Sequence, residues 1–292
     1  MKKLLLVVLV SVFPVIMMFA QGKKVAANEV EKTLAQGWKT YIFSDYKGAM
    51  RNFTAVIDSV PATTTDDKLM SARLKATYGL GLVYNFNDNP DKKKAAELYE
   101  TVIKEGGKHD EVAWAMLALG RMKHVVGVNE EPDFTAIRAA YQRLIDAFPV
   151  HQATEEAIVY LQETYVVSWQ KSDALIAEKN LLKYINGYPN PNFLRAAYVC
   201  LDRVYRILEK PKERLAANMA LLKIVEEDKV NPSVRDLTGQ IWVIGDIAEW
   251  GLGDFSLARK YYNRLIKEYP LDMRVFAAKI ALQRMSDMER RK

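Results

Sequence analysis

Phe53-Thr-Ala-Val-Ile-Asp-Ser-Val-Pro61, Tyr141-Gln-Arg-Leu-Ile-Asp-Ala-Phe-Pro149, Leu181-Leu-Lys-Tyr-Ile-Asn-Gly-Tyr-Pro189 and Tyr262-Asn-Arg-Leu-Ile-Lys-Glu-Tyr-Pro270 are four copies of one pattern. Each begins with an aromatic residue or leucine, continues with an apolar pair and ends at proline. Proline terminates helices because it lacks an N–H donor and clashes with the preceding turn. Two weaker copies, Tyr99 to Gly107 and Leu221 to Lys229, fill the gaps.

The repeated segments predict a stack of helical hairpins. They end near residues 61, 107, 149, 189, 229 and 270, so successive ends lie 40 to 46 residues apart. One helix cannot fill that period, whereas two helices of about 15 residues with short turns can. Twelve residues before each end stands a small or apolar residue that lets two helices approach: Ala49, Ile137, Ala177, Ala217 and Ala258. The sequence therefore predicts an all-α fold.

Parts of the sequence resemble the tetratricopeptide repeat family. The last unit carries Trp242, Gly253-Asp254-Phe255, Ala258, Tyr262 and Pro270, and the first carries Gly37, Tyr46, Ala49, Phe53 and Pro61. The second unit contributes Leu80-Gly81-Leu-Val-Tyr84. Tyr165 and Tyr205 depart from the family, because they stand where it prefers a small residue. The resemblance implies one domain, residues 28–292, folded as a right-handed α-α superhelix of about six hairpins that binds protein or peptide.

The segment 272–292 predicts a single amphipathic helix after the last hairpin. Its apolar positions are Val275, Phe276, Ile280, Leu282, Met285 and Met288. An open stack needs an end helix with one apolar face to cover its final hairpin. We expect this segment to be a C-terminal capping helix.

The N-terminus has the layout of a signal peptide. Lys2 and Lys3 precede an apolar run, Leu4 to Ala20, that only Ser11 and Pro14 interrupt. Cleavage is expected after Ala20, with Ala27 as the alternative, and a retained membrane anchor is a further alternative. No cysteine lies near either site to carry a lipid. An exported bacterial protein, periplasmic or secreted, is the expectation.

Composition argues against several classes of function. The net charge is +6, and removal of residues 1–20 leaves 40 basic against 36 acidic residues, or +4, which is too little to indicate nucleic-acid binding. The single cysteine, Cys200, cannot form an intramolecular disulfide and is expected to be a buried small residue. We expect no cofactor.

No catalytic or metal-binding motif stands out. His109, His124 and His151 lack a second histidine or a cysteine at the spacing of a zinc site. The acidic pair Glu155-Glu156 is expected on a solvated helix face. Since the repeats occupy the chain to residue 292, no segment is left for a glycosidase-like carboxylate cleft. The sequence therefore favours a protein that is not an enzyme.

Aromatic and arginine side chains are the candidate binding residues. Tyr41, Trp169 and Trp250 each lie 20 residues before the end of a unit, a position that faces the concave groove in the family. Neighbouring positions on the same face hold Trp38, Trp114, Arg121 and Arg206. Such side chains anchor interfaces at low entropic cost. The alternative is that the aromatic rings pack between hairpins.

Two functions are compatible with these observations. The leading hypothesis is a scaffold of the bacterial cell envelope that binds a protein or peptide partner in its groove, within an envelope or outer-membrane complex. The alternative is a peptidoglycan- or glycan-associated accessory protein of a cell-wall enzyme, in which the aromatic rings stack on sugars.

Overall fold

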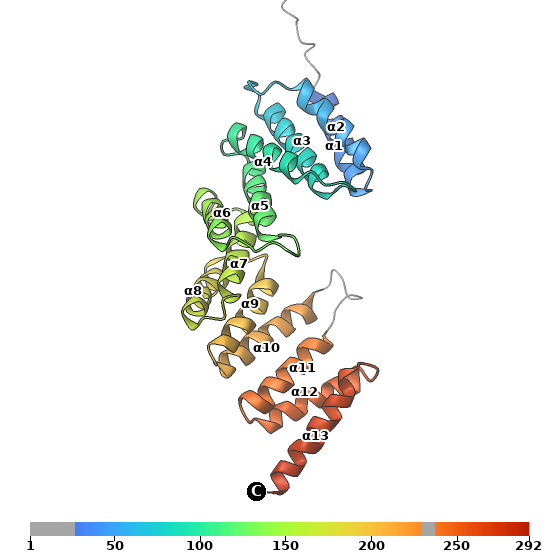
Figure 1. Cartoon of the computed structure of the whole chain (residues 1–292). Helices are drawn as coiled ribbons and strands as arrows, with labels where there is room; N and C mark the ends of the chain where they lie inside the picture. Colours follow the sequence, from blue (N-terminus) through green and yellow to red (C-terminus); the bar gives the residue numbers. More distant parts are fainter. Residues whose placement is uncertain (1–26, 229–236, 292) are drawn as a thin grey trace, which may run out of the picture.

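The protein is an elongated stack of helices in a computed structural model that describes residues 27–228 and 237–291 (Figure 1). Within these residues every regular element is helical, which confirms the predicted fold class. The helices are α1 (Ala27–Ile42), α2 (Tyr46–Ser59), α3 (Asp67–Phe86), α4 (Lys92–Glu105), α5 (Asp110–His124), α6 (Phe134–Ala147), α7 (Gln152–Val166), α8 (Lys171–Gly187), α9 (Leu194–Ile207), α10 (Pro211–Glu227), α11 (Thr238–Asp246), the π-helix η2 (Ile247–Gly251), α12 (Phe255–Glu268) and α13 (Arg274–Arg290).

Consecutive helices pair into six hairpins, as the repeat predicted. The first helices of the hairpins are α1, α3, α5, α7, α9 and α11, and the second helices are α2, α4, α6, α8, α10 and α12. Each first helix contacts the second helix of its own hairpin, and each second helix contacts the first helix that follows. From α1 to α9, each first helix also contacts the next first helix. The first helices from α1 to α9 therefore form one continuous face.

A glycine opposite a buried aromatic ring holds the two helices of a hairpin together. A Cβ atom on Gly81, Gly120 or Gly245 would lie 2.6 to 2.7 Å from the ring of Tyr99, Tyr141 or Tyr262, respectively. These rings are fully buried, as is Phe53, which meets Gly37 in the first hairpin. The close approach leaves no room for a side chain on the first helix. The small residues predicted on the second helices are buried as well.

The fourth and fifth hairpins replace this contact by a polar one. Gln162 of α7 accepts a hydrogen bond from Asn180 at 3.1 Å, and Asp202 of α9 accepts one from Asn218 at 2.7 Å. The second helices α8 and α10 are 17 residues long, whereas those of the other hairpins have 14. Because of these three additional residues, counting back from the end of the unit reaches a position on the first helix that is three residues too late. The glycine position in these hairpins is therefore held by Gln162 and Asp202, and not by Tyr165 and Tyr205.

Aspartate begins the second helix in the hairpins that match the repeat best. The side chains of Asp45, Asp91, Asp133 and Asp254 each accept a hydrogen bond from the backbone N–H three residues further on, in the first turn of the helix. This satisfies a donor that the helix itself leaves unpaired. Gly253, with φ +64°, turns the chain directly before Asp254. The Gly-Asp pair thus fixes where the second helix starts.

The row of first helices is interrupted between α9 and α11. Among the described residues, the backbone of α9 does not approach that of α11, and α11 contacts α10 instead. Polar side chains fill this junction. Arg214 and Asn218 of α10 both donate to Asp202 of α9, at 2.7 Å each, and Gln240 of α11 donates to Asn218 at 2.6 Å. The last hairpin is thus joined to the others mainly through α10.

The C-terminal helix α13 packs on α12 and α11, but its apolar residues do not all face them. Val275, Ala278, Ala281 and Met285 are buried in the last core cluster, and Leu282 packs against it. Phe276, Ile280 and Met288 are exposed. The prediction of a helix at this place is confirmed. The prediction of one apolar face is wrong, because the apolar positions divide between two faces of the helix.

The predicted leader, residues 1–20, and the end of the fifth unit near residue 229 lie outside the described residues. None of the helices in the described part of the chain combines the length and the hydropathy that a membrane span requires.

Cys200 is fully buried in the core between α7 and α10, as expected from its apolar setting. Burial raises the pKa of its thiol to about 12. Because the thiolate is the reactive form, the native protein should resist alkylation by iodoacetamide at neutral pH. We expect modification only as the protein unfolds in denaturant, which mass spectrometry of samples along a urea series measures. Rapid labelling of the native protein would contradict this.

Candidate binding groove

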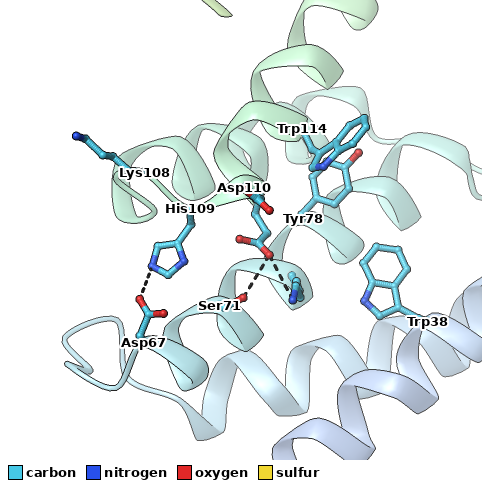
Figure 2. A pocket seen from close by; sticks show the side chains of 10 residues that line it. Trp38, Asp67, Ser71, Tyr78, Lys108, His109, Asp110 and Trp114 are labelled. Atoms are coloured by element: carbon cyan, nitrogen blue, oxygen red, sulfur yellow. Dashed lines mark hydrogen bonds and ion pairs between the residues drawn. The ribbon is translucent and has the colours of Figure 1, made fainter. Parts of the chain in front are cut away.

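A groove of about 780 Å³ lies across the first helices of the first three hairpins. Trp38 comes from α1, the middle of the groove comes from α3, and the start of α5 closes it. Its lining residues are Trp38, Asp67, Ser71, Lys75, Tyr78, Lys108, His109, Asp110, Glu111 and Trp114. Figure 2 shows three aromatic rings at one end of the groove and ionisable side chains at the other. The groove therefore combines an apolar part and a polar part.

The aromatic part is held in place by rings of the core. The ring of Trp38 lies 5.1 Å from that of Phe53 and 6.5 Å from that of Tyr78, measured between centroids. Tyr78 in turn lies 5.6 Å from the buried ring of Tyr99. Burial raises the pKa of Tyr78, so its hydroxyl stays protonated at neutral pH. These rings have one edge in the core and another at the groove, which limits their freedom before any ligand arrives.

The polar part consists of paired side chains from α3 and α5. His109 lies 3.4 Å from a carboxylate oxygen of Asp67. The buried Glu111 carboxylate accepts a hydrogen bond from Ser71 at 3.3 Å and lies 3.7 Å from the ammonium of Lys75. The carboxylates of Asp67 and Asp110 are largely exposed at the rim. The rim thus presents acidic groups to solvent next to the aromatic part.

Serine, histidine and aspartate occur together here, but not as a nucleophilic triad. In such a triad the histidine accepts the proton of the serine hydroxyl. The hydroxyl of Ser71 donates instead to Glu111, and no hydrogen bond joins it to His109 among the described residues. The described residues also contain no group of three or more His, Cys, Asp or Glu side chains placed to hold a metal ion. The groove therefore provides aromatic rings that can pack against a ligand and charged side chains that can pair with it.

Four of the predicted binding residues lie in or beside the groove. Trp38 and Trp114 line it directly. Tyr41 stacks edge-on against Trp38 with centroids 6.0 Å apart. Arg121 of α5 forms an ion pair with the buried Glu156 of α7, and its guanidinium lies 5.8 Å from the ring centroid of Tyr160. The first helices therefore bring residues from distant parts of the sequence to one face.

The other three predicted residues lie elsewhere. Trp169, 62% exposed, stands in the turn after α7 with φ +54° and is equivalent to Ser44 and Gly253. Trp250, 63% exposed, lies in η2 under the guanidinium of Arg284, at 4.7 Å. Arg206 of α9 pairs with Asp202 at 3.2 Å. The equivalence of Trp169 with Tyr41 and Trp250 is wrong, because the longer α8 displaces it by three residues. The alternative that Trp169 and Trp250 are packed in the core is also wrong.

Tyr78, Lys75 and Glu111 line the groove but were not predicted from the sequence. Tyr78 stands three residues before the packing glycine Gly81, as Trp242 stands three before Gly245. Alignment on the glycines would therefore have found it. The expectation of a solvated Glu155-Glu156 pair is wrong: both side chains are buried. Glu155 accepts hydrogen bonds from Tyr184, at 2.8 Å, and from Asn192.

Comparison with known proteins identifies one repeat of a known family in the last hairpin. Residues 242–272, which run from α11 through α12, match the tetratricopeptide repeat family. Among solved structures, the chain is similar to the Assembly Chaperone of RpL4 (Acl4), with a TM-score of 0.46 and 16% identity over 90% of this chain and 98% of that chain. No curated protein matches the sequence. With six consecutive hairpins and a tetratricopeptide repeat as the last of them, the chain is a tetratricopeptide-like helical repeat protein.

Proposed function

We propose that the chain is a non-catalytic scaffold that binds a segment of a partner protein in the groove formed by α1, α3 and α5. The observation that carries the proposal is the joining of Trp38, Tyr78 and Trp114, from three hairpins, in one groove. Partly buried rings held by core contacts lose little freedom on binding, which is why aromatic residues dominate interface energetics. The tetratricopeptide repeat of the last hairpin supports the general assignment to protein binding.

The charges of the groove indicate the chemistry of the partner segment. Lys75 is engaged by the buried Glu111, and Lys108 is exposed. Asp67 and Asp110 lie near His109 and His151 but keep their carboxylates largely exposed at the rim. A segment with an apolar or aromatic residue for the rings and a lysine or arginine for the rim would complement both parts. Complementary charge at a solvent-exposed rim mainly guides association and orientation.

We further propose that this scaffold is exported and acts in the bacterial cell envelope. The support comes from the sequence of residues 1–20, with two lysines before an apolar run that only Ser11 and Pro14 interrupt. Mass spectrometry of the protein from a periplasmic or culture fraction tests this proposal. A mature chain that begins after Ala20 or Ala27 is the expected result, whereas an intact leader in a cytoplasmic fraction would contradict export.

Site-specific photo-crosslinking tests the groove directly. A photo-reactive amino acid at Lys75, which is 51% exposed inside the groove, should attach a partner protein in the cell. The matched control is Lys94 on the second helix α4, 48% exposed and also paired with a nearby glutamate. We expect a defined protein adduct from Lys75 and none from Lys94. Equal adducts at both positions would reject the groove as the site.

The variant Trp114→Ala distinguishes specific binding from proximity. Loss of an interface anchor typically costs about 2 kcal/mol, or about thirtyfold in affinity. We therefore expect the Lys75 adduct to disappear in this variant while the circular dichroism spectrum stays helical. The glycan-associated alternative is favoured if no protein adduct forms and the photo-reactive group at Lys75 attaches to peptidoglycan fragments instead, in a manner that depends on Trp114.

A further inference from the structure

The helix α13 exposes a second apolar face at the opposite end of the stack from the groove (Figure 1). Phe276, Ile280 and Met288 recur at four- and eight-residue intervals, which places them along one side of the helix. Leu271 and Met273, also exposed, extend the patch beyond the start of the helix. Several large exposed apolar side chains near one another on a helix are typical of a protein interaction site.

The equivalent faces of α5 and α7 show what packs against this side of a first helix elsewhere in the fold. His109, His151 and Asp272 occupy the same position at the start of these helices. The N–H group of each donates to the carbonyl three residues before it, and its own carbonyl accepts from the N–H three residues after it. Counting eleven residues onward from each makes Gly120, Gln162 and Gln283 equivalent.

The equivalent positions in α5 and α7 face the second helix of the same hairpin. Gly120 faces the ring of Tyr141 in α6, and Gln162 bonds to Asn180 in α8. Three and seven residues earlier, on the same helix side, α5 places Leu117 and Ala113, which are buried. The corresponding residues of α13 are Ile280 and Phe276. No helix covers them among the described residues.

We propose that a second copy of this chain covers this face, with its own α13 lying antiparallel in the place that a second helix takes in each hairpin. The two halves of the face differ in a way that suits a symmetric pairing. The exposed Phe276 projects from one half, and a hollow of about 350 Å³ lies on the other, lined by Ile280, Gln283, Arg284, Asp287, Met288 and Arg291. A two-fold axis near residue 282 inserts each Phe276 into the hollow of the other copy, as a symmetric interface requires.

Charge supports the same arrangement. Lys279 is exposed on the half of α13 that carries Phe276. Asp287, which also pairs with Arg290 of its own helix at 2.9 Å, lies on the half that carries the hollow. Antiparallel pairing brings each Lys279 toward the Asp287 of the other copy. It also sets the positive end of one helix dipole beside the negative end of the other, whereas a parallel pair would juxtapose like ends.

Sedimentation equilibrium of the purified protein over a wide concentration range tests this proposal. We expect a monomer–dimer equilibrium whose dissociation constant rises at least about tenfold in Ile280→Asp and in Phe276→Asp, with unchanged circular dichroism. The control is Leu175→Asp on α8, where the leucine is 51% exposed, compared with 47% for Ile280. A monomer at every concentration, or equal loss of the dimer in Leu175→Asp, would overturn the proposal.

Cross-linking tests the symmetry. A two-fold axis near residue 282 places the two copies of residue 283 close together, so Gln283→Cys should cross-link to itself with a short thiol-reactive reagent. Cys200 is buried and does not compete. Lys267→Cys, an exposed position on α12, should remain uncross-linked. A stable dimer that cross-links through Lys267→Cys and not through Gln283→Cys would place the contact elsewhere and reject the pairing of α13.

Discussion

Gly120→Ala is expected to destabilise the protein by about 1 to 3 kcal/mol, the usual cost of overpacking a core. The new methyl group would lie 2.6 Å from the ring of Tyr141, which is fully buried and has no space to withdraw. Helix propensity alone would make the same change stabilising by up to about 1 kcal/mol. A loss of stability would therefore show that the packing against Tyr141 outweighs helix propensity. Urea denaturation followed by circular dichroism measures it.

Gly187→Ala provides the matched control. Gly187 is the last residue of α8, and no atom lies within 4 Å of the position a Cβ would take. We expect Gly187→Ala to be neutral or slightly stabilising, because alanine restricts the unfolded chain more than glycine. The double variant Gly120→Ala/Tyr141→Leu should lose less stability than the sum of its single variants, since leucine lacks the ring atoms that clash. Additive losses would show that the contact is not the cause.

Glu155→Ala is expected to cost about 3 kcal/mol or more. The buried carboxylate accepts three hydrogen bonds: from the hydroxyl of Tyr184 at 2.8 Å, the backbone N–H of Asn192 at 2.8 Å and the side-chain amide of Asn192 at 2.7 Å. Burial, and next the bond to Glu155, raise the pKa of Tyr184, so its hydroxyl remains a donor at neutral pH. Removal of the carboxylate leaves these three donors without their acceptor, and the hydroxyl of Tyr184 is buried, where water does not replace it.

The control for this prediction is Glu100→Ala, at an exposed position of α4, which should change stability by less than about 0.5 kcal/mol. Glu155→Gln should fall between the two, because one acceptor oxygen remains. Thermal unfolding monitored by circular dichroism compares the three variants. Equal melting temperatures for Glu155→Ala and Glu100→Ala would mean that the buried network does not stabilise the fold.

The arrangement of hairpins could be predicted because each hairpin carries the same local sequence pattern in its second helix. A proline or glycine ends five of the six units, and in every unit a small or apolar residue and then a ring or leucine precede the end at fixed spacing. The alignment within the fourth and fifth hairpins could not be predicted from the ends of the units. Gln170 and Lys210 begin α8 and α10 without a side-chain cap, so no Asp marks the turn there. Without an aspartate at the turn, the greater length of α8 and α10 could not be recognised, and Trp169 was assigned to the wrong position.

The candidate groove was only partly predictable for a different reason. Trp38 and Trp114 could be chosen by residue type and helical position, but the contacts that orient them come from other hairpins. The burial of Glu155 depends on Tyr184 and Asn192, which lie 29 and 37 residues further along the chain. A pair of adjacent glutamates carries no local sign of such partners. Pairings over this distance become visible only when the hairpins are stacked.

The interruption between α9 and α11 is expected to divide the stack into two cooperative folding units. Stability in a repeat protein passes from neighbour to neighbour, so the interface with the fewest contacts limits how far an unfolding event spreads. Here the polar junction of Asp202, Asn218 and Gln240 replaces the apolar contact found between the earlier first helices. Amide hydrogen exchange should accordingly give one protection level for α1 to α10 and another for α11 to α13, with the step at this junction.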